Sequence, residues 1–156
     1  MIKNTSLKNK NVLITGGAGF IGSELTKQAL SLGANVSVVD NLVNGKKSNL
    51  NLDDKNLMFY EEDIRNQQVM QNLISKSDYV FNLACLGVRH SIHSPIESHS
   101  VNADATLNLL KISRETDIKK FVHISTSEVY GTAKYVPMTE EHPTAPHTVY
   151  GASKLA

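Results

Sequence analysis

Two residues near the end of the chain have the types and the spacing needed to remove a proton from an alcohol. Tyr150 and Lys154, in the stretch VYGASKLA, are four residues apart and would share one face of a helix. A neighbouring ammonium group favours the phenolate and lowers the pKa of a tyrosine from its ordinary value of about 10. The spacing therefore predicts a general base, Tyr150, whose pKa is lowered toward working pH by Lys154.

A second reactive stretch, HISTSEVYG, occupies residues 123–131. It brings together the hydroxyls of Ser125, Thr126 and Ser127 and the carboxyl group of Glu128, a candidate acid or base. By itself the pattern also fits a strand end, rich in serine and threonine, that closes a turn. Its place at the carboxyl end of a predicted strand, where doubly wound sheets bind their ligands, makes it a candidate part of an active site.

The glycine-rich segment TGGAGFIG, residues 15–22, predicts a cradle for phosphate groups. Gly16, Gly19 and Gly22 are three residues apart, between a predicted strand and a helix that begins near Phe20. Such glycines permit a tight turn, a close approach of the backbone to a pyrophosphate and close helix–strand packing, while the helix N-terminus offers N–H groups. A tight turn without a ligand is the alternative. No Gly-Lys-Ser/Thr follows, so the segment is not a P-loop.

An acidic residue at the end of the second predicted strand favours NAD as the dinucleotide. Asp40 follows Gly16 by 24 residues, at the place where a carboxylate hydrogen-bonds the hydroxyls of the adenosine ribose. A carboxylate repels a 2′-phosphate, although Lys46 and Lys47 could in principle meet one, as NADP would require. Asp63, after the third predicted strand, is either a neighbour of the adenine ring or an ordinary loop acid.

The elements that position these residues follow from hydrophobic periodicity. Short apolar runs rich in β-branched residues predict strands at residues 11–15, 35–39, 57–60, 79–84 and 120–125. Helical spacing predicts helices at residues 20–32, 67–74 and 95–116, a final helix from residue 149, and a loop over residues 131–148. Apolar strands that alternate with helices predict an α/β fold with a Rossmann-like doubly wound parallel sheet. We expect one dinucleotide-binding domain over residues 1–156.

Composition argues against several other classes of protein. A net charge of +1 over 156 residues provides no nucleic-acid-binding face, and no apolar run is long enough to span a membrane. The single cysteine, Cys85, cannot form an internal disulfide and would pack as a small apolar residue, so a cytoplasmic location is expected. Three histidines, His90, His93 and His99, are close in sequence, but loop and helix-start positions explain them, and no metal site is expected.

The ordered set of motifs resembles the extended short-chain dehydrogenase/reductase family. The motifs are TGGAGFIG, Asp40-Asn41, NLA at residues 82–84, STSEVYG and YGASK, and together they cover essentially the whole chain. Within that family the chain resembles the NAD-dependent nucleotide-sugar epimerase/dehydratase branch. The resemblance implies NAD as cofactor, a UDP-, GDP- or dTDP-sugar as substrate and, by family analogy, a homodimer.

The same resemblance assigns residues to the parts of the dinucleotide. It places Gly16, Gly19, Phe20 and Ile21, with Gly22 closing the turn, at the pyrophosphate; Asp40, Asn41, Asn44 and Gly45 at the adenosine ribose; Asp63 and Ile64 at the adenine; and Leu83, Ala84, Cys85, Asn102, Ser125, Tyr150 and Lys154 along the remainder of the cofactor.

The catalytic roles carried over from the family fall on four residues. Tyr150 would remove the proton from a sugar hydroxyl, usually O4, while Lys154 binds the nicotinamide ribose and Thr126 hydrogen-bonds the reacting oxygen. A 4-epimerase re-reduces the resulting 4-keto sugar, a 4,6-dehydratase removes water from it, and a UDP-glucuronate decarboxylase releases CO2. Glu128 resembles the acid of dehydratases and decarboxylases, whereas DNLVNGKKSNL resembles epimerases, so all three reactions stay open.

Relatives of this kind continue beyond the position of Lys154 with a substrate-binding domain. We therefore expect this chain to correspond to their amino-terminal part, with the C-terminal substrate domain absent. The main alternative is a non-catalytic NAD-binding module, or a fragment of a longer enzyme that is inactive alone. A simple alcohol or steroid reductase is disfavoured, because those proteins more often carry N-N-A-G where residues 82–85 read NLAC.

Overall fold

Five parallel strands form the centre of the computed structural model, which describes residues 6–156. The strand order is β3-β2-β1-β4-β5, and every neighbouring pair is parallel. The chain therefore adds strands on one side of β1, then returns to the other side, which creates the switch point where such sheets bind ligands. The strands are β1 (Asn11–Thr15), β2 (Asn35–Val39), β3 (Leu57–Tyr60), β4 (Tyr79–Asn82) and β5 (Lys120–His123).

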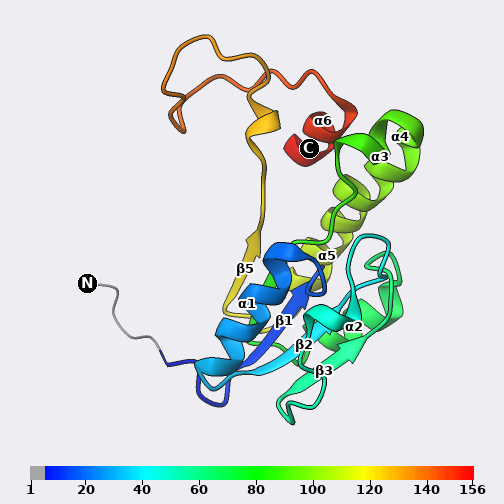
Figure 1. The fold of residues 1–156 in the computed structure, drawn as a ribbon, viewed down its shortest axis with the longest axis vertical. Coiled ribbons are helices and arrows are strands. Elements are labelled where there is room, and N and C mark those ends of the chain that lie inside the picture. The colour runs from blue at the N-terminus through cyan, green and yellow to red at the C-terminus, as the bar shows by residue number, and fades with distance from the viewer. Residues whose placement is uncertain (1–5) are drawn as a thin grey trace. The chain divides into compact units, whose positions relative to one another are not determined.

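The predicted helices are present (Figure 1), whereas α3, η1 and η3 lie in segments for which the periodicity predicts no helix. The predicted helix over residues 95–116 is present as a run of α4, a π-helical segment η2 and α5, in which the Thr106 hydroxyl donates to the carbonyl of Asn102 (2.9 Å). The helical elements are α1 (Phe20–Ser31), η1 (Lys47–Asn49), α2 (Gln67–Ile74), α3 (Val88–His93), α4 (Pro95–His99), η2 (Ser100–Ala105), α5 (Thr106–Arg114), η3 (Ser127–Val129) and α6 (Val149–Leu155).

Two strands end earlier than predicted. The predicted strands at residues 79–84 and 120–125 stop at Asn82 and His123, which pair with each other across the sheet. Asn82 also pairs with Thr15, the last residue of β1, after which the chain turns away at Gly16. The apolar pattern continues past Asn82 and His123. However, β1 ends at Thr15, so β4 has no residue of β1 to pair with beyond Asn82.

Alternating residues of the central strands supply the core on both faces of the sheet. Val12, Ile14, Val36 and Val38 belong to one buried cluster, which includes Ala29 of α1. Side chains of opposite parity, such as those of Leu13 and Val39, are also fully buried and face the other side. Strands buried on both faces are the mark of a doubly wound sheet, so the predicted fold class is confirmed.

Contacts divide the chain into two compact units. The first comprises the chain up to Ala84 together with Asn108–His123 and contains the whole sheet. The second comprises Cys85–Leu107 and Ile124–Ala156. The glycine-rich segment and Asp40 therefore belong to the first unit, and the hydroxyl cluster, Tyr150 and Lys154 to the second. The expectation of one domain over residues 1–156 stays a prediction. Within residues 6–156 no helix is both long and apolar enough to cross a membrane.

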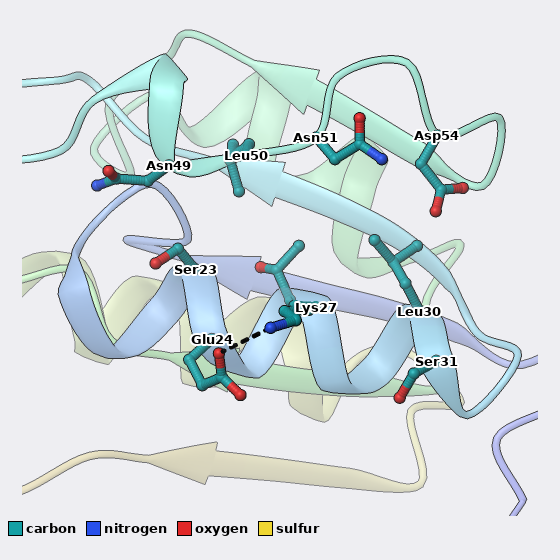
Figure 2. A pocket seen from close by; sticks show the side chains of 10 residues that line it. Ser23, Glu24, Lys27, Leu30, Ser31, Asn49, Leu50, Asn51 and Asp54 are labelled. Carbon is teal, nitrogen blue, oxygen red and sulfur yellow. Dashed lines mark ion pairs between the residues drawn. The ribbon is translucent and has the colours of Figure 1, made fainter.

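A polar groove lies in the first unit, between α1 and the loop that follows η1 (Figure 2). Its volume is about 530 Å³, and Glu24 and Lys27 form an ion pair of 3.9 Å along its wall. None of the residues that the sequence assigns to a cofactor or to catalysis lines it, so the groove is separate from the predicted site. Its lining residues are Ser23, Glu24, Thr26, Lys27, Leu30, Ser31, Asn49, Leu50, Asn51 and Asp54.

Candidate dinucleotide site and active site

The glycine turn between β1 and α1 has no room for side chains. Gly16 has a φ of 69°, and a Cβ atom placed there would lie 2.7 Å from the backbone nitrogen of Ala84. A Cβ atom on Gly22 would collide with the carbonyl oxygen of Gly16. The first glycine is therefore required for the turn and the third for close packing of the helix, as the spacing predicts.

The start of α1 has the features of an anion-binding helix terminus. Its N-cap residue is Gly19, and no side chain caps the helix. The first N–H groups of a helix have no intrahelical partner and point toward any anion placed there. Phe20 and Ile21 expose 93% and 65% of their surface, so these two apolar side chains flank the helix start in the first unit. The turn thus fits a pyrophosphate.

Asp40 joins the end of β2 to the glycine turn. Its carboxylate accepts hydrogen bonds from the backbone nitrogens of Ala18 (3.0 Å) and Leu42 (2.8 Å) and is largely buried. These bonds use one acceptor site on each oxygen, and the second site on each suits a ribose diol. A Cβ atom on Gly45 would lie 2.7 Å from Asp40 Oδ1, so the loop that also carries Asn44 closes tightly over the carboxylate. The structure therefore gives Asp40 a structural task in addition to the predicted one.

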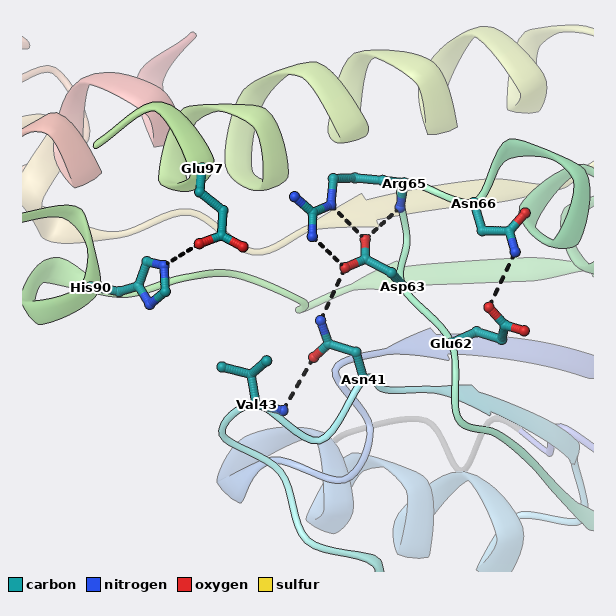
Figure 3. Close-up of polar contacts among 8 residues, drawn as sticks. All are labelled: Asn41, Val43, Glu62, Asp63, Arg65, Asn66, His90 and Glu97. Atoms are coloured by element: carbon teal, nitrogen blue, oxygen red, sulfur yellow. Dashed lines mark hydrogen bonds and ion pairs between the residues drawn. The ribbon is translucent and has the colours of Figure 1, made fainter. Parts of the chain in front are cut away.

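A network of charge-assisted hydrogen bonds surrounds Asp63 (Figure 3). Arg65 donates its Nε to Asp63 Oδ1 (2.9 Å) and its Nη2 to Oδ2 (2.7 Å), and the backbone nitrogen of Arg65 also donates to Oδ1 (2.8 Å). Asn41, at the end of β2, donates its Nδ2 to Oδ2 (3.1 Å). The hydrogen bond from Arg65 lowers the pKa of Asp63 below its ordinary value, against the opposing effect of burial. Ile64 is a buried core residue, so only its main chain is placed to meet a ligand.

The ends of β1 and β4 are held together by buried polar side chains. Thr15 donates its hydroxyl to Asn82 Oδ1 (2.6 Å) and accepts from the backbone nitrogen of Ala84 (3.2 Å). The amide of Asn82 in turn contacts the ring nitrogen of His123 (3.1 Å). This arrangement fixes the main chain at Leu83 and Ala84, two residues that the sequence assigns to the dinucleotide.

The second unit brings the two reactive stretches together. Thr148 is the N-cap of α6 and accepts from the backbone nitrogen of Gly151 (2.9 Å), while its hydroxyl donates to Glu128 Oε2 (3.2 Å). Thr126 caps the short helix η3 by accepting from the backbone nitrogen of Glu128 (3.3 Å). One chain of hydrogen bonds therefore connects the hydroxyl–acid stretch to the first turn of the helix that carries Tyr150.

The electrostatics of Tyr150 differ from the sequence prediction. Burial is the largest influence and raises the pKa of Tyr150 above its ordinary value, and the neighbouring Cys85 raises it as well. A hydrogen bond with Thr126 acts in the opposite direction and lowers the pKa. Lys154, only 7% exposed, has its own pKa lowered by burial. The prediction that the ammonium group lowers the pKa of Tyr150 is therefore wrong for this arrangement, because desolvation disfavours the charged form of both side chains.

We expect the hydroxyl group of Thr126 to lower the pKa of Tyr150 and so to favour the phenolate. Replacing Thr126 with valine removes the hydroxyl that stabilises the phenolate, so the pKa of Tyr150 should rise further, whereas T126S should leave it unchanged. The measurement is a ¹³C NMR titration of ring-labelled tyrosine, with the Tyr150 signal assigned by its loss in Y150F. An unchanged or lower pKa in T126V would contradict this expectation.

Three other predicted cofactor contacts lie in the second unit. Asn102 is 2% exposed, and its side-chain amide accepts from the backbone nitrogen of Leu86 (2.9 Å) and donates to the carbonyl of the same residue (2.8 Å). Cys85, a free thiol, is partly buried beside Tyr150 and Lys154. Ser125 is exposed. Their contacts with a dinucleotide stay predictions, although the amide of Asn102 already holds the turn after β4.

The predicted loop over residues 131–148 is held by a buried histidine. His142 is 3% exposed, and its Nε2 accepts from the backbone nitrogen of Lys134 (2.9 Å). Its ring packs against Tyr130, with centroids 5.5 Å apart, and Tyr135, at 4.7 Å. No local pattern predicts this role, because it depends on contacts between residues seven or more positions apart.

Two of the remaining histidines have acidic neighbours. His90 Nε2 lies 2.9 Å from Glu97 Oε2, and His99 lies 4.0 Å from Asp104 (Figure 3 shows the first pair). In the part of the chain that the structure describes, no group of three or more histidine, cysteine, aspartate or glutamate side chains is arranged to hold a metal ion.

Sequence reasoning missed Arg65 and Thr148. Thr148 carries a recognisable signal, because a threonine just before a helical stretch is a preferred N-cap. Arg65 gives no such signal, since an arginine two residues after an aspartate is commonly a solvated surface residue. Their partners become evident only from the folded backbone.

The chain is similar to proteins that are named as enzymes of nucleotide sugars. A family model described as GDP-mannose 4,6 dehydratase matches residues 13–156. A putative UDP-glucose 4-epimerase of Methanocaldococcus jannaschii is 36% identical over 146 residues, which are 92% of this chain and 47% of that protein. The UDP-glucose 4-epimerase of Lacticaseibacillus casei is also 36% identical, over 93% of this chain and 44% of that protein.

Solved structures that are similar to this chain are also named as enzymes of nucleotide sugars. A UDP-N-acetylglucosamine 4-epimerase from Methanobrevibacter ruminantium, in complex with UDP-N-acetylmuramic acid, superimposes with a TM-score of 0.89 and 36% identity, over 95% of this chain and 48% of that one. A dTDP-glucose 4,6-dehydratase from Streptomyces venezuelae, solved with NAD bound, has a TM-score of 0.87 and 34% identity, over 93% and 48%. The chain thus spans less than half of the length of the curated relatives described above.

Proposed function

Because this chain belongs to the GDP-mannose 4,6-dehydratase family, a nucleotide-sugar branch of the extended short-chain dehydrogenases/reductases, we propose that it forms the NAD-binding and catalytic part of a nucleotide-sugar epimerase or dehydratase. The observation that carries the proposal is the second unit, where Thr126, Glu128 and Tyr150 are connected by hydrogen bonds and Lys154 lies one turn beyond Tyr150. A hydroxyl, an acid, a phenol and an amine are the groups that oxidation of a sugar alcohol requires.

The residues of the first unit would hold the cofactor. The uncapped start of α1 and the side-chain-free turn at Gly16 and Gly22 suit the pyrophosphate, and the two remaining acceptor sites of Asp40 suit the adenosine ribose. When bound, NAD would supply a hydride acceptor and later a hydride donor. Asp40 favours NAD over NADP because a carboxylate repels a 2′-phosphate.

The residues of the second unit would handle the protons. Tyr150 removes the proton from the sugar hydroxyl, and Thr126 donates a hydrogen bond that stabilises the phenolate and orients the reacting oxygen. Lys154 supplies a positive charge near the same place when it is protonated. Glu128, which accepts a hydrogen bond from Thr148, would act as a base toward a neighbouring carbon, as loss of water from a 4-keto sugar requires. A 4-epimerase needs no such base, so a base role for Glu128 would favour a dehydratase.

The substrate class follows from the relatives. UDP-sugars are the first candidates, since three of the four relatives described above are named as UDP-sugar 4-epimerases. dTDP-sugars come next, because the fourth is named as a dTDP-glucose 4,6-dehydratase. A homodimer and a cytoplasmic location belong to the same proposal. Ile92 and Ile96, in α3 and α4 of the second unit, expose 70% and 83% of their surface and are the apolar side chains that a dimer would cover. Light scattering of the purified chain tests the dimer.

One experiment separates this proposal from the alternative of a non-catalytic NAD-binding module. NAD is titrated by calorimetry, and UDP-, GDP- and dTDP-sugars are assayed for conversion, with this chain and with the chain extended by any coding sequence that follows Ala156. We expect NAD binding by both proteins and conversion of a UDP-sugar by the extended one. NAD binding without conversion by either protein would support the module. A chain that binds no NAD would contradict both.

A further inference from the structure

The carboxylate of Asp63 has no acceptor site left. A carboxylate offers about four acceptor positions, two on each oxygen. Oδ1 accepts from the backbone nitrogen and the Nε of Arg65, and Oδ2 accepts from Arg65 Nη2 and Asn41 Nδ2. Any further donor, including the amino group of an adenine, has to replace one of these four bonds.

The four bonds are not equally strong. Both side-chain bonds from Arg65 are charge-assisted. Together they form a bidentate contact with the two carboxylate oxygens, at 2.9 Å and 2.7 Å. The donor from Asn41 is neutral, and its distance of 3.1 Å is the longest of the four. Asn41 lies next to Asp40 and accepts a weak bond of 3.3 Å from the backbone of Val43. An incoming amino group would therefore displace Asn41 and leave Arg65 in place.

We propose that Arg65 is a positioning residue for purine recognition, which fixes the carboxylate of Asp63 so that Oδ2 accepts a hydrogen bond from the adenine amino group in exchange for Asn41 (Figure 3). This inference rests on the proposed binding of NAD. The released amide of Asn41, beside Asp40, then becomes available to the adenosine ribose. The exchange replaces one bond with another, so selectivity for adenine depends on how rigidly Arg65 holds the carboxylate.

The rigidity of the Asp63 carboxylate matters because hypoxanthine presents a different group to it than adenine does. Hypoxanthine carries a carbonyl oxygen where adenine carries the amino group, and two acceptors facing each other repel. A carboxylate that cannot rotate away rejects hypoxanthine, whereas a mobile one turns aside. Ordering a free side chain on binding also weakens affinity roughly 2- to 12-fold. Because Arg65 already holds the Asp63 carboxylate in one orientation, this loss of affinity is avoided.

The test compares NAD with nicotinamide hypoxanthine dinucleotide by calorimetry on the 156-residue chain. We expect the unaltered chain to prefer NAD by tenfold or more. Arg65→Ala should weaken NAD binding roughly 3- to 10-fold and bring the preference close to unity, and Arg65→Lys, which keeps the charge but not the bidentate contact, should be intermediate. Asn41→Ala should keep the preference, because adenine displaces Asn41. Arg114→Ala, which removes an exposed arginine of α5, is the matched control.

The outcomes distinguish this inference from the proposed function. An unaltered chain that does not bind NAD contradicts the proposed function. Suppose that the unaltered chain binds NAD selectively. If the Arg65→Ala variant then keeps the full preference for NAD over nicotinamide hypoxanthine dinucleotide, or binds NAD more tightly, only the role of Arg65 is overturned. A loss of preference in Asn41→Ala overturns the exchange. Circular dichroism spectra and melting temperatures confirm that each variant is folded.

Discussion

Replacing Tyr150 with phenylalanine is expected to lower the turnover of the nucleotide sugar by about 10²- to 10⁴-fold, the range that a positioned acid or base contributes. The ring and its packing in α6 remain, so only the hydroxyl that contacts Thr126 is lost. The affinity for NAD should change much less, because most of the predicted dinucleotide contacts lie in the first unit. Steady-state kinetics and calorimetry, on this chain and on the chain extended past Ala156, measure the two quantities separately.

The control for Tyr150→Phe is Tyr60→Phe in β3, which removes a hydroxyl whose partner is the sulfur of Met58 at 3.8 Å. This variant should keep full turnover. A Tyr150→Phe variant with turnover within tenfold of the unaltered protein would contradict the role of Tyr150 as the base. The dependence on pH adds a second check. Because burial raises the pKa of Tyr150, the phenolate fraction and kcat/KM should increase with pH through the neutral range.

A glycine-to-alanine change at residue 22 should destabilise the first unit. The added methyl group would collide with the carbonyl oxygen of Gly16, and the backbone atoms of the turn have little freedom to move away. Overpacking of this kind costs on the order of 3 kcal/mol, equivalent to a fall in melting temperature of roughly 6–12 °C. The displaced turn should also bind NAD more weakly. Thermal unfolding followed by circular dichroism measures the first effect, and calorimetry the second.

The matched control for Gly22→Ala is Gly87→Ala. Nothing lies within 4 Å of a Cβ atom at Gly87, and its φ of −77° is accessible to alanine. This variant should be about as stable as the unaltered chain, because the lower entropy of the unfolded chain offsets the poorer N-cap preference of alanine at the start of α3. Equal melting temperatures for the two variants would show that the contact between Gly22 and Gly16 does not constrain the turn.

Local sequence patterns were sufficient for most of the sheet and for the glycine turn. The run NVLIT predicts β1 and the glycines predict the turn because both depend on neighbouring residues: side-chain branching favours the strand, and the absence of Cβ atoms permits the close approach. The same holds for the spacing of Tyr150 and Lys154, which are in one helix as predicted. The ends of β4 and β5 were missed, because pairing with the other strands sets them.

The sequence by itself determined where the five strands and the predicted helices lie along the chain, the glycine turn and the types of group available for chemistry, since these follow from local geometry and residue type. Only the tertiary structure decided how those groups behave. Asn41, 22 residues away in the chain, completes the hydrogen bonds to Asp63 that Arg65 begins, Thr148 connects Glu128 to α6, and burial raises the pKa of Tyr150 where the spacing predicts the opposite. Desolvation and hydrogen bonding between distant residues exist only once the chain has folded around them, so no local pattern reveals them.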